Sequence, residues 1–252
     1  MLISIITICF NRKATISKTI ESVLLQDYKD IEYIIIDGNS TDGTKEIIES
    51  YGDKITTFVS EQDKGLYYAL NKGIQLAKGD VIGLLHSDDE YYDSSVVSKI
   101  VAAFHENPDT DGVFGNGIYV TNCNDNQRVV RARIGGENSL EKLKSGWLPL
   151  HTTVCLRREI FEKYGYYNLD YKIASDSELL LRYLYIHQID MTYLNIYFVK
   201  MRMGGLSTDY KRFIQILLED IKIYKKIGVP AYKLVFLKKV KAISQYLDKI
   251  IL

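Results

Sequence analysis

Short apolar runs and helix-like stretches alternate along the first half of the chain. The apolar runs are rich in isoleucine and valine, and between them apolar residues recur at helical spacing, as Ile16, Ile20 and Val23 do. Strands that alternate with helices predict right-handed βαβ units and a parallel sheet. The predicted strands are Leu2–Ile8, Ile31–Ile36, Ile55–Val59 and Val81–Leu85, and the predicted helices are Ile16–Gln26, a short one through Ile47 and Ile48, and Tyr67–Ala77.

The pattern becomes less regular after a helix predicted for Ser94–Asn107, which Pro108 ends. Two strand-like runs joined across residues 122–127 indicate a β-hairpin. Ala174–Tyr185 then has apolar residues on one helical face, with Ser175 or Asp176 at its start. The remaining predicted elements are the hairpin strands Gly112–Val120 and Arg128–Ile134, a strand at Thr153–Leu156, a short helix around Ile160, a strand at Met191–Val199 and a glycine-containing loop at Met203–Ser207.

The last part of the chain, residues 208–252, has its own charge and pattern. Two helices are predicted here, separated by Gly228, Val229 and Pro230, and the segment from Asp209 onward holds ten basic residues against four acidic ones. In the second helix lysines interleave with apolar residues, which is the composition of a helix that lies on an anionic membrane surface. The same pattern also fits an amphipathic helix packed on its own domain with solvated lysines, and both interpretations stay open.

Composition narrows the class of protein. The chain has 252 residues, enough for one large or two small domains, and 46% of them are hydrophobic. Its formal net charge is zero, which gives no reason to expect a nucleic-acid partner. Cys9, Cys123 and Cys155 fit neither a disulfide framework nor a metal-binding spacing. The start of the chain has no leader pattern and no apolar run approaches the ~18 residues of a membrane span, so we expect a cytoplasmic protein that does not cross a bilayer.

Each predicted strand of the first half ends in a cluster of polar residues. Because the carboxyl ends of parallel strands meet at one edge, where open α/β sheets bind ligands, we expect these clusters to form a nucleotide site. The fourth cluster contains Asp88, Asp89 and Glu90, and carboxylates this close repel one another unless a cation such as Mg²⁺ or Mn²⁺ offsets the repulsion. The alternative is a solvated turn whose acids cap the next helix. The clusters are residues 7–12, 37–42, 60–64 and 87–90.

Taken in order, these strand ends resemble the inverting family 2 glycosyltransferases with the GT-A fold. The resemblance covers about residues 1–207 and is carried by SIITICFNR (4–12), IIIDGNSTDGT (34–44), SEQDKGLYYALNKGI (60–74), GDVIGLLHSDDEYY (79–92), ASDSELLLR (174–182) and MGGLS (203–207). It implies an α/β, Rossmann-like fold with a mostly parallel central sheet, helices on both faces and a C-terminal helical extension. The implied parts are a GT-A domain at 1–207, with a nucleotide-binding half (1–107) and an acceptor half (108–207), followed by the basic tail.

The resemblance also implies which residues bind a UDP-sugar. Asp37 would accept the N–H of a pyrimidine base, although it could equally cap the helix that follows Gly38. The turn at Asp63 and Lys64 would contact a phosphate or the ribose, although a Lys-Gly pair is also an ordinary turn. The implied donor-binding residues are Thr7, Phe10, Arg12, Asp37, Asp63, Lys64, Asp88, Arg202, Gly205 and Ser207, of which the last two lie with Gly204 in a loop that closes over the diphosphate.

The chain departs from the family at its metal-binding signature. The first acid of the D-x-D pattern is replaced by His86, so Asp88, helped by Asp89, must hold the Mn²⁺ or Mg²⁺ ion together with the donor's diphosphate oxygens. Imidazole suits Mn²⁺ better than Mg²⁺. His86 could thus be a ligand of Mn²⁺, but because imidazole is a poor ligand for Mg²⁺, we expect a supporting or core histidine.

Inverting transfer to a hydroxyl needs a base on the acceptor side, and Asp176 matches the family's base. Glu178 lies two residues further on and should point elsewhere. Asp176 could instead be a helix N-cap. Trp147 and His151 match the region that shapes the acceptor pocket, and a buried structural histidine is the alternative for the latter.

These expectations combine into a UDP-sugar-dependent hexosyltransferase of bacterial polysaccharide or O-antigen synthesis. Its acceptor would be a hydroxyl of a saccharide linked to polyprenyl pyrophosphate, and its basic tail would hold it peripherally at the inner face of the cytoplasmic membrane. Transfer to a polyprenyl phosphate, a non-catalytic nucleotide-binding module and a membrane-surface scaffold are the alternatives. An NAD-binding domain is disfavoured because no G-x-G-x-x-G follows the first strand.

Overall fold

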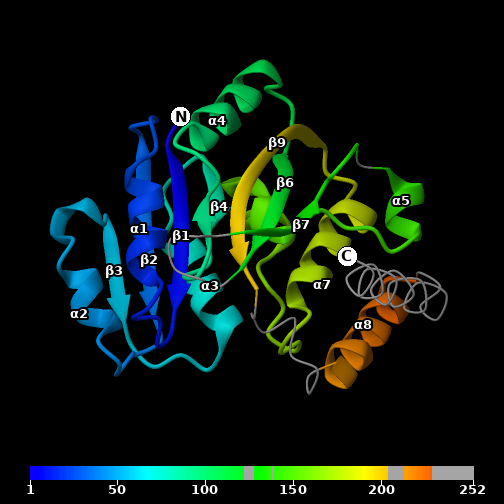
Figure 1. Cartoon of the computed structure of the whole chain (residues 1–252). Coiled ribbons are helices and arrows are strands. Elements are labelled where there is room, and N and C mark those ends of the chain that lie inside the picture. Colours follow the sequence, from blue (N-terminus) through cyan, green and yellow to red (C-terminus); the bar gives the residue numbers. More distant parts are fainter. Residues whose placement is uncertain (122–127, 138, 204–212, 229–252) are drawn as a thin grey trace.

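One twisted sheet runs through the whole molecule and carries helices on both faces (Figure 1). The computed structural model describes residues 1–121, 128–137, 139–203 and 213–228. Within these residues nine strands form the sheet in the order β3-β2-β1-β4-β8-β6-β9-β5, and β7 pairs with β6. The strands are β1 (Ile3–Cys9), β2 (Ile31–Asp37), β3 (Thr57–Ser60), β4 (Val81–Leu84), β5 (Glu90–Tyr91), β6 (Gly112–Val120), β7 (Val129–Arg133), β8 (Cys155–Arg157) and β9 (Met191–Arg202).

The first four long strands are parallel, as the alternating pattern predicts. β1 lies between β2 and β4, with Ile6 opposite both Ile34 and Leu84, and β3 pairs with the outer edge of β2. All four strands therefore point their carboxyl ends at one edge of the sheet. This edge gathers the polar clusters that the sequence places after each strand.

The second half of the sheet is mixed rather than parallel. β8 runs antiparallel to β4 and to β6, while β6 and β9 are parallel. The predicted hairpin of β6 and β7 is confirmed as an antiparallel pair with an irregularity at Tyr119 and Val120. The short strand β5, which the sequence analysis does not predict, pairs antiparallel with β9. The sheet is thus fully parallel among β1 to β4 and mixed beyond β4, where only β6 and β9 among the described strands run parallel.

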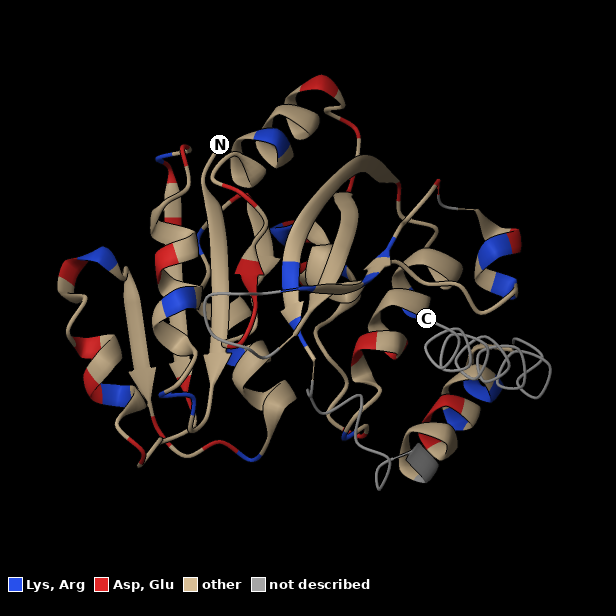
Figure 2. Cartoon of the chain, viewed as in Figure 1, with Lys and Arg blue, Asp and Glu red and all other residues tan. Residues whose placement is uncertain are grey.

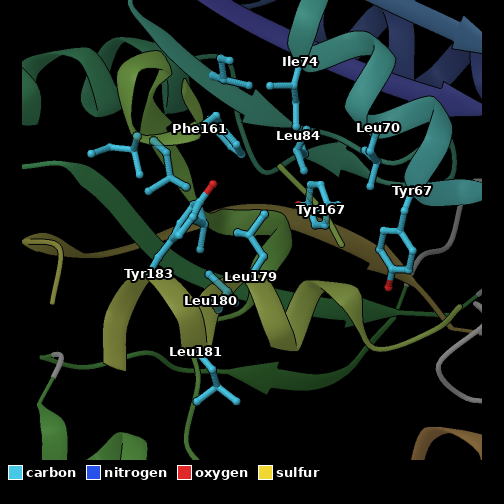
Figure 3. Close-up of a cluster of buried hydrophobic side chains, with 14 of the residues drawn as sticks. Tyr67, Leu70, Ile74, Leu84, Phe161, Tyr167, Leu179, Leu180, Leu181 and Tyr183 are labelled. Atoms are coloured by element: carbon cyan, nitrogen blue, oxygen red, sulfur yellow. The ribbon is translucent and has the colours of Figure 1, made fainter. Parts of the chain in front are cut away.

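Alternate residues of the central strands face opposite helix layers. Ile5 packs into a core formed with α1 (Ile16–Leu24) and α4 (Val96–Glu106), whereas its neighbour Ile6 packs into a core formed with α3 (Leu66–Leu76), α6 (Arg158–Tyr164) and α7 (Ser175–Leu181). Figure 3 shows the second core, in which Leu70 and Ile74 of α3 lie across from side chains of α6 and α7. The predicted α/β class with helices on both faces is confirmed. The other helices are α2 (Thr44–Glu49), α5 (Leu140–Lys144) and α8 (Phe213–Ile227).

The helix predicted for Ala174–Tyr185 is regular only as far as Leu181. Residues Arg182–Ile186 form a π-helical turn instead. The Arg182 guanidinium donates to the carbonyls of Tyr164, Gly165 and Tyr166, and the side chain of Glu178 pairs with it at 3.1 Å. These bonds tie the turn to a segment about 17 residues earlier, a contact that local spacing does not reveal.

The C-terminal extension begins as predicted. Helix α8 ends at Ile227, just before Gly228. The second predicted helix of the tail lies outside the described residues. In the part of the chain that the structure covers, no helix has the length and apolar character needed to span a membrane.

Candidate active site

An open cleft of about 210 Å³ lies at the carboxyl ends of β1 and β4, between the nucleotide-binding half and the start of α7. It brings together Asp88 and Asp176, the two carboxylates to which the sequence analysis gives separate chemical roles. If either carboxylate were fully buried, or if the two lay on opposite surfaces of the protein, they could not act on one bound substrate. The lining residues are Arg12, Leu66, Tyr67, Leu70, His86, Ser87, Asp88, Asp89, Tyr119, Leu150, His151, Thr152, Tyr167, Lys172, Ile173, Asp176, Met201 and Arg202.

Asp176 lies in the first turn of α7, where two side chains contact its carboxylate. Its Oδ2 atom lies 3.3 Å from Nδ1 of His151, and its Oδ1 atom lies 3.4 Å from the hydroxyl of Tyr67. The side chain keeps 28% of its surface exposed, so the carboxylate remains open to the cleft. Glu178, in contrast, is buried against Arg182 and faces away, as expected. An oriented but accessible carboxylate is what proton abstraction from a bound hydroxyl requires.

His151 links Asp176 to the end of β4. Its Nε2 atom lies 3.1 Å from Nε2 of His86, so the three side chains form a continuous chain. Burial, together with His151 and Arg12, lowers the pKa of His86 to about 3, which keeps this imidazole neutral. A neutral His86 that donates its Nε2–H leaves His151 to donate Nδ1–H to Asp176, a tautomer assigned here from the hydrogen-bond pattern. His86 is therefore a supporting residue whose Nε2 already has a partner.

Tyr67 and Tyr167 form an aromatic wall beside Asp176. Their rings are stacked with centroids 5.4 Å apart (Figure 3). Both residues border the cleft. Tyr67 is predicted to start a helix and lies in the family-like segment 60–74, but neither it nor Tyr167 is predicted as a site residue. Both side chains are buried in the core between α3 and α7, so they support the cleft from below.

Asp88 and Asp89 lie side by side but in different surroundings. Asp88 lines the cleft and is half-buried, whereas Asp89 is buried. Burial and the charge of Asp88 raise the pKa of Asp89 well above its ordinary value, despite the opposing effect of Arg202. A divalent cation at Asp88 would offset this repulsion, so the pair fits Mg²⁺ or Mn²⁺. No group of three acidic, histidine or cysteine side chains among the described residues could hold a metal alone, so the donor's phosphate oxygens would have to complete the coordination.

Phe10 and Arg12 follow β1 at the donor end of the site. Phe10 is 58% exposed, and its ring lies beside Gly38, where an added Cβ would come to 3.4 Å from it. An exposed aromatic ring here can stack on a base. Arg12 lines the cleft, and its backbone N–H donates to Thr44 at 2.7 Å.

Asp37 and Thr7 are further from the cleft than the resemblance implies. The Asp37 carboxylate is fully buried and accepts bonds from the Ser40 backbone and hydroxyl, from the Ser60 hydroxyl and from the Cys9 thiol. Thr7 is also fully buried, and its hydroxyl pairs with that of Tyr33. Asp37 ties three strand ends together, and Thr7 packs in the core. A base could reach Asp37 only by displacing one of its hydroxyl partners.

The turn before α3 contains a buried carboxylate. Oδ1 of Asp63 accepts a bond from Lys72 at 2.6 Å, while Oδ2 is buried and has no hydrogen-bond partner in the described part of the chain. An unpartnered buried oxygen of this kind is costly unless a ligand donates to it. The neighbouring Lys64 is exposed at the surface. Neither residue lines the cleft itself.

The remaining predicted residues divide into three groups. Arg202 lines the cleft, and its guanidinium lies 3.6 Å from Glu90. Trp147 is not among the cleft-lining residues and packs edge-on against Phe114 with centroids 6.1 Å apart, so its predicted contact with the acceptor stays a prediction. Gly205 and Ser207 lie outside the described residues.

Lys172 lines the acceptor side of the cleft and is another residue that the sequence analysis misses. Its only signal is its position in the segment YKIASDSE just before the carboxylate. A single lysine in a loop has no pattern that marks it as functional.

Comparison with known proteins assigns a family to this arrangement. The family described as "Glycosyl transferase family 2" matches residues 4–165. A protein named "PGL/p-HBAD biosynthesis glycosyltransferase" from Mycobacterium bovis is 28% identical over 209 residues, which cover 81% of this chain and 78% of the relative.

Solved structures show the same fold. S. aureus TarS 1–349 in complex with UDP-GlcNAc has a TM-score of 0.68 and 18% identity, covering 92% of this chain and 68% of that one; in the longer TarS structure the match spans 40% of the other chain. The mannosyltransferase PcManGT from Pyrobaculum calidifontis, in complex with GDP-Man and Mn²⁺, has a TM-score of 0.65 and 15% identity, covering 94% of this chain and 68% of that one. These likenesses bear out the predicted GT-A, Rossmann-like fold.

Proposed function

The chain belongs to glycosyl transferase family 2, and on this premise we propose that it transfers a hexose from a UDP-sugar, with inversion, to a hydroxyl of a lipid-linked saccharide. The product would enter the synthesis of a bacterial surface polysaccharide or O-antigen. The observation that carries the proposal is the shared cleft of Asp88 and Asp176, in which one carboxylate lies at the strand end and the other opens a helix on the opposite side.

Asp176 acts as the general base in this proposal. The acceptor hydroxyl would donate its proton to Asp176 while its oxygen attacks the anomeric carbon from the face opposite the leaving diphosphate, which inverts the configuration. His151 and Tyr67 orient the carboxylate through its two oxygens.

Asp88 and Arg202 would bind the diphosphate of the UDP-sugar donor. A divalent cation held by Asp88 and the diphosphate would stabilise the charge on the leaving UDP. Arg202 and Arg12 line the same cleft, and their guanidinium groups would pair with phosphate oxygens. Phe10 would stack on the base. A pyrimidine, rather than a purine, is proposed from the resemblance alone, since the Asp37 carboxylate is buried and its hydrogen bonds are already made.

Exposed lysines on α8 support the proposal that the acceptor is linked to a lipid. The exposed side of α8 carries Lys222, Lys225 and Lys226 together with Leu218, which is 61% exposed. Figure 2 shows basic and acidic positions along the ribbon of this helix. Lysines with an exposed apolar residue can bind an anionic bilayer surface peripherally, which would bring the cleft to a polyprenyl-linked substrate.

A screen of nucleotide sugars for UDP release, with Mn²⁺ and a short-lipid GlcNAc or GalNAc pyrophosphate acceptor, tests the proposal. We expect one UDP-hexose to be consumed and NMR of the product to show the inverted anomeric configuration. A product with retained configuration, or a GDP-sugar as the only donor consumed, would contradict it.

A further inference from the structure

Helix α8 contacts the segment that leads into α7 through one side chain. The carboxylate of Glu219 accepts hydrogen bonds from three consecutive backbone N–H groups, those of Lys172 at 3.1 Å, Ile173 at 2.9 Å and Ala174 at 3.0 Å. Gln215, one turn earlier in α8, donates to the same carboxylate at 3.1 Å. A carboxylate with three amide donors is a strong and directional contact.

The start of α7 lacks a cap of its own. Its N-cap position is Ala174, which has no side-chain acceptor, and the hydroxyl of Ser175 donates to the carbonyl of Asn168 instead. A negative charge near this end is favourable because the first N–H groups of a helix carry partial positive charge. Burial raises the pKa of Glu219, but the amide donors outweigh it, and the pKa lies below its ordinary value.

The segment bound by Glu219 also binds Tyr67, one of the two side chains that contact Asp176. The carbonyl of Ile173 accepts the hydroxyl of Tyr67 at 2.6 Å, and the same hydroxyl lies 3.4 Å from Asp176. The backbone of Ile173 is thus fixed by two hydrogen bonds: its N–H donates to Glu219, and its carbonyl accepts from Tyr67. Asp176 follows two residues after Ala174, in the first turn of α7.

Packing fixes α8 in place for this contact. Ile223 and Tyr224 are buried in the same core as Tyr171 and Leu179. The ammonium of Lys222 lies 5.3 Å from the centre of the Tyr171 ring, a cation–π contact. The side of α8 that carries Glu219 is therefore held against the loop before α7.

We propose that Glu219 is a positioning residue for Asp176, so that α8 completes the active site although it lies outside the residues matched by the family. This inference rests on the proposed role of Asp176 as the base. Glu219 touches neither substrate nor base and acts by fixing the backbone of residues 172–174. Loss of this contact shifts the base relative to the acceptor hydroxyl, and such misplacement costs roughly ten- to a hundredfold in rate.

The test uses Glu219→Gln and Glu219→Ala in the full chain. Glutamine keeps the size of the side chain but replaces an acceptor oxygen with a donor that opposes the N–H groups. We expect kcat to fall about tenfold or more for each variant, with the KM for the donor and the affinity for UDP with Mn²⁺ unchanged. Glu159→Gln, an exposed glutamate in the first turn of α6, is the matched control and should keep the parent rate.

A double-mutant cycle with Asp176→Asn separates positioning from a general loss of structure. If Glu219 acts through Asp176, adding Glu219→Gln to Asp176→Asn leaves the residual rate unchanged within about twofold. A further drop equal to that of Glu219→Gln alone would show that the two residues act independently and would overturn the inference. If Glu219→Ala does not fold, as judged by circular dichroism, Glu219→Gln decides alone.

The cycle also distinguishes this inference from the proposed function. Full activity of Asp176→Asn would remove the proposed base. Inactive Asp176→Asn beside fully active Glu219→Gln would leave the base in place and overturn the positioning role alone.

Discussion

Nδ1 of His151 lies 3.3 Å from a carboxylate oxygen of Asp176, although the two residues come from different elements. The other nitrogen of the same ring lies 3.1 Å from His86, directly after β4. The carboxylate on the acceptor side is thus connected by side chains to the strand end that carries Asp88. In the proposed mechanism, this connection would let His151 orient the Asp176 carboxylate.

Replacement of His151 by asparagine should lower kcat about ten- to a hundredfold, because Asp176 loses the partner of its Oδ2 atom. UDP binding should stay unchanged, since the donor end of the cleft is untouched. Steady-state kinetics and calorimetry measure the two effects. His105→Gln, at the exposed end of α4, serves as the control. A loss of UDP affinity equal to the loss of rate would contradict an orienting role.

Asp88→Asn should abolish the gain in UDP affinity that Mn²⁺ provides. The remaining neutral oxygen is a weak ligand, and Asp89 is buried behind it. Calorimetric titration of UDP with and without Mn²⁺ measures this gain. The exposed Asp53→Asn should behave as the parent protein. Retention of the full gain by Asp88→Asn would place the metal elsewhere.

Glu219 should make stability depend on pH in the acid range. Its pKa is lowered on folding from an ordinary value near 4.5, so its contribution is complete above that value and is lost as pH falls through the folded pKa. The difference in Tm between the parent and Glu219→Gln should therefore stay constant from neutral pH down to about pH 4.5 and shrink as the pH falls below that value. Thermal unfolding followed by circular dichroism measures it. A difference that stayed constant below that value as well would contradict the assignment.

Gly79→Ala should destabilise the fold by about 1–3 kcal/mol through overpacking. A Cβ at this position would lie 2.6 Å from the backbone nitrogen of Ser4 in β1, which cannot move without disturbing the sheet. Urea unfolding measures the loss. Lys78→Ala, one residue earlier and exposed, should stay within about 0.5 kcal/mol of the parent. Equal stability of the two variants would contradict the close approach.

The elements of the first half could be predicted from the sequence because their signal is local. Ile3–Cys9 and Leu66–Leu76 lie within about two residues of the predicted bounds, since buried strands and amphipathic helices each leave a periodic pattern. The insertion of β8 between β4 and β6 could not be predicted, because strand order depends on contacts between distant segments. The extension of β9 to Arg202 has the same cause, since its pairing with β6 continues to that residue.

The site was predictable where a residue follows a strand or opens a helix, as Asp88 and Asp176 do. It was not predictable where two residues meet through the fold. His86 and His151 are 65 positions apart, and nothing in either segment indicates that their rings touch. Asp37 is a different case, because its motif can be recognised in the sequence but its burial cannot. Its four hydrogen bonds come from residues that the fold brings together.

The pairing of β4 with β8, and of β5 with β9, sets a limit on protein engineering with this scaffold. Each pair joins a strand from before residue 107 to one from after it, so the sheet interleaves the two halves of the chain. A chimera with a single crossover near Pro108 would mismatch two sets of strand edges and the core beneath them. Exchange of acceptor preference between relatives would therefore succeed by grafting loops onto an intact sheet.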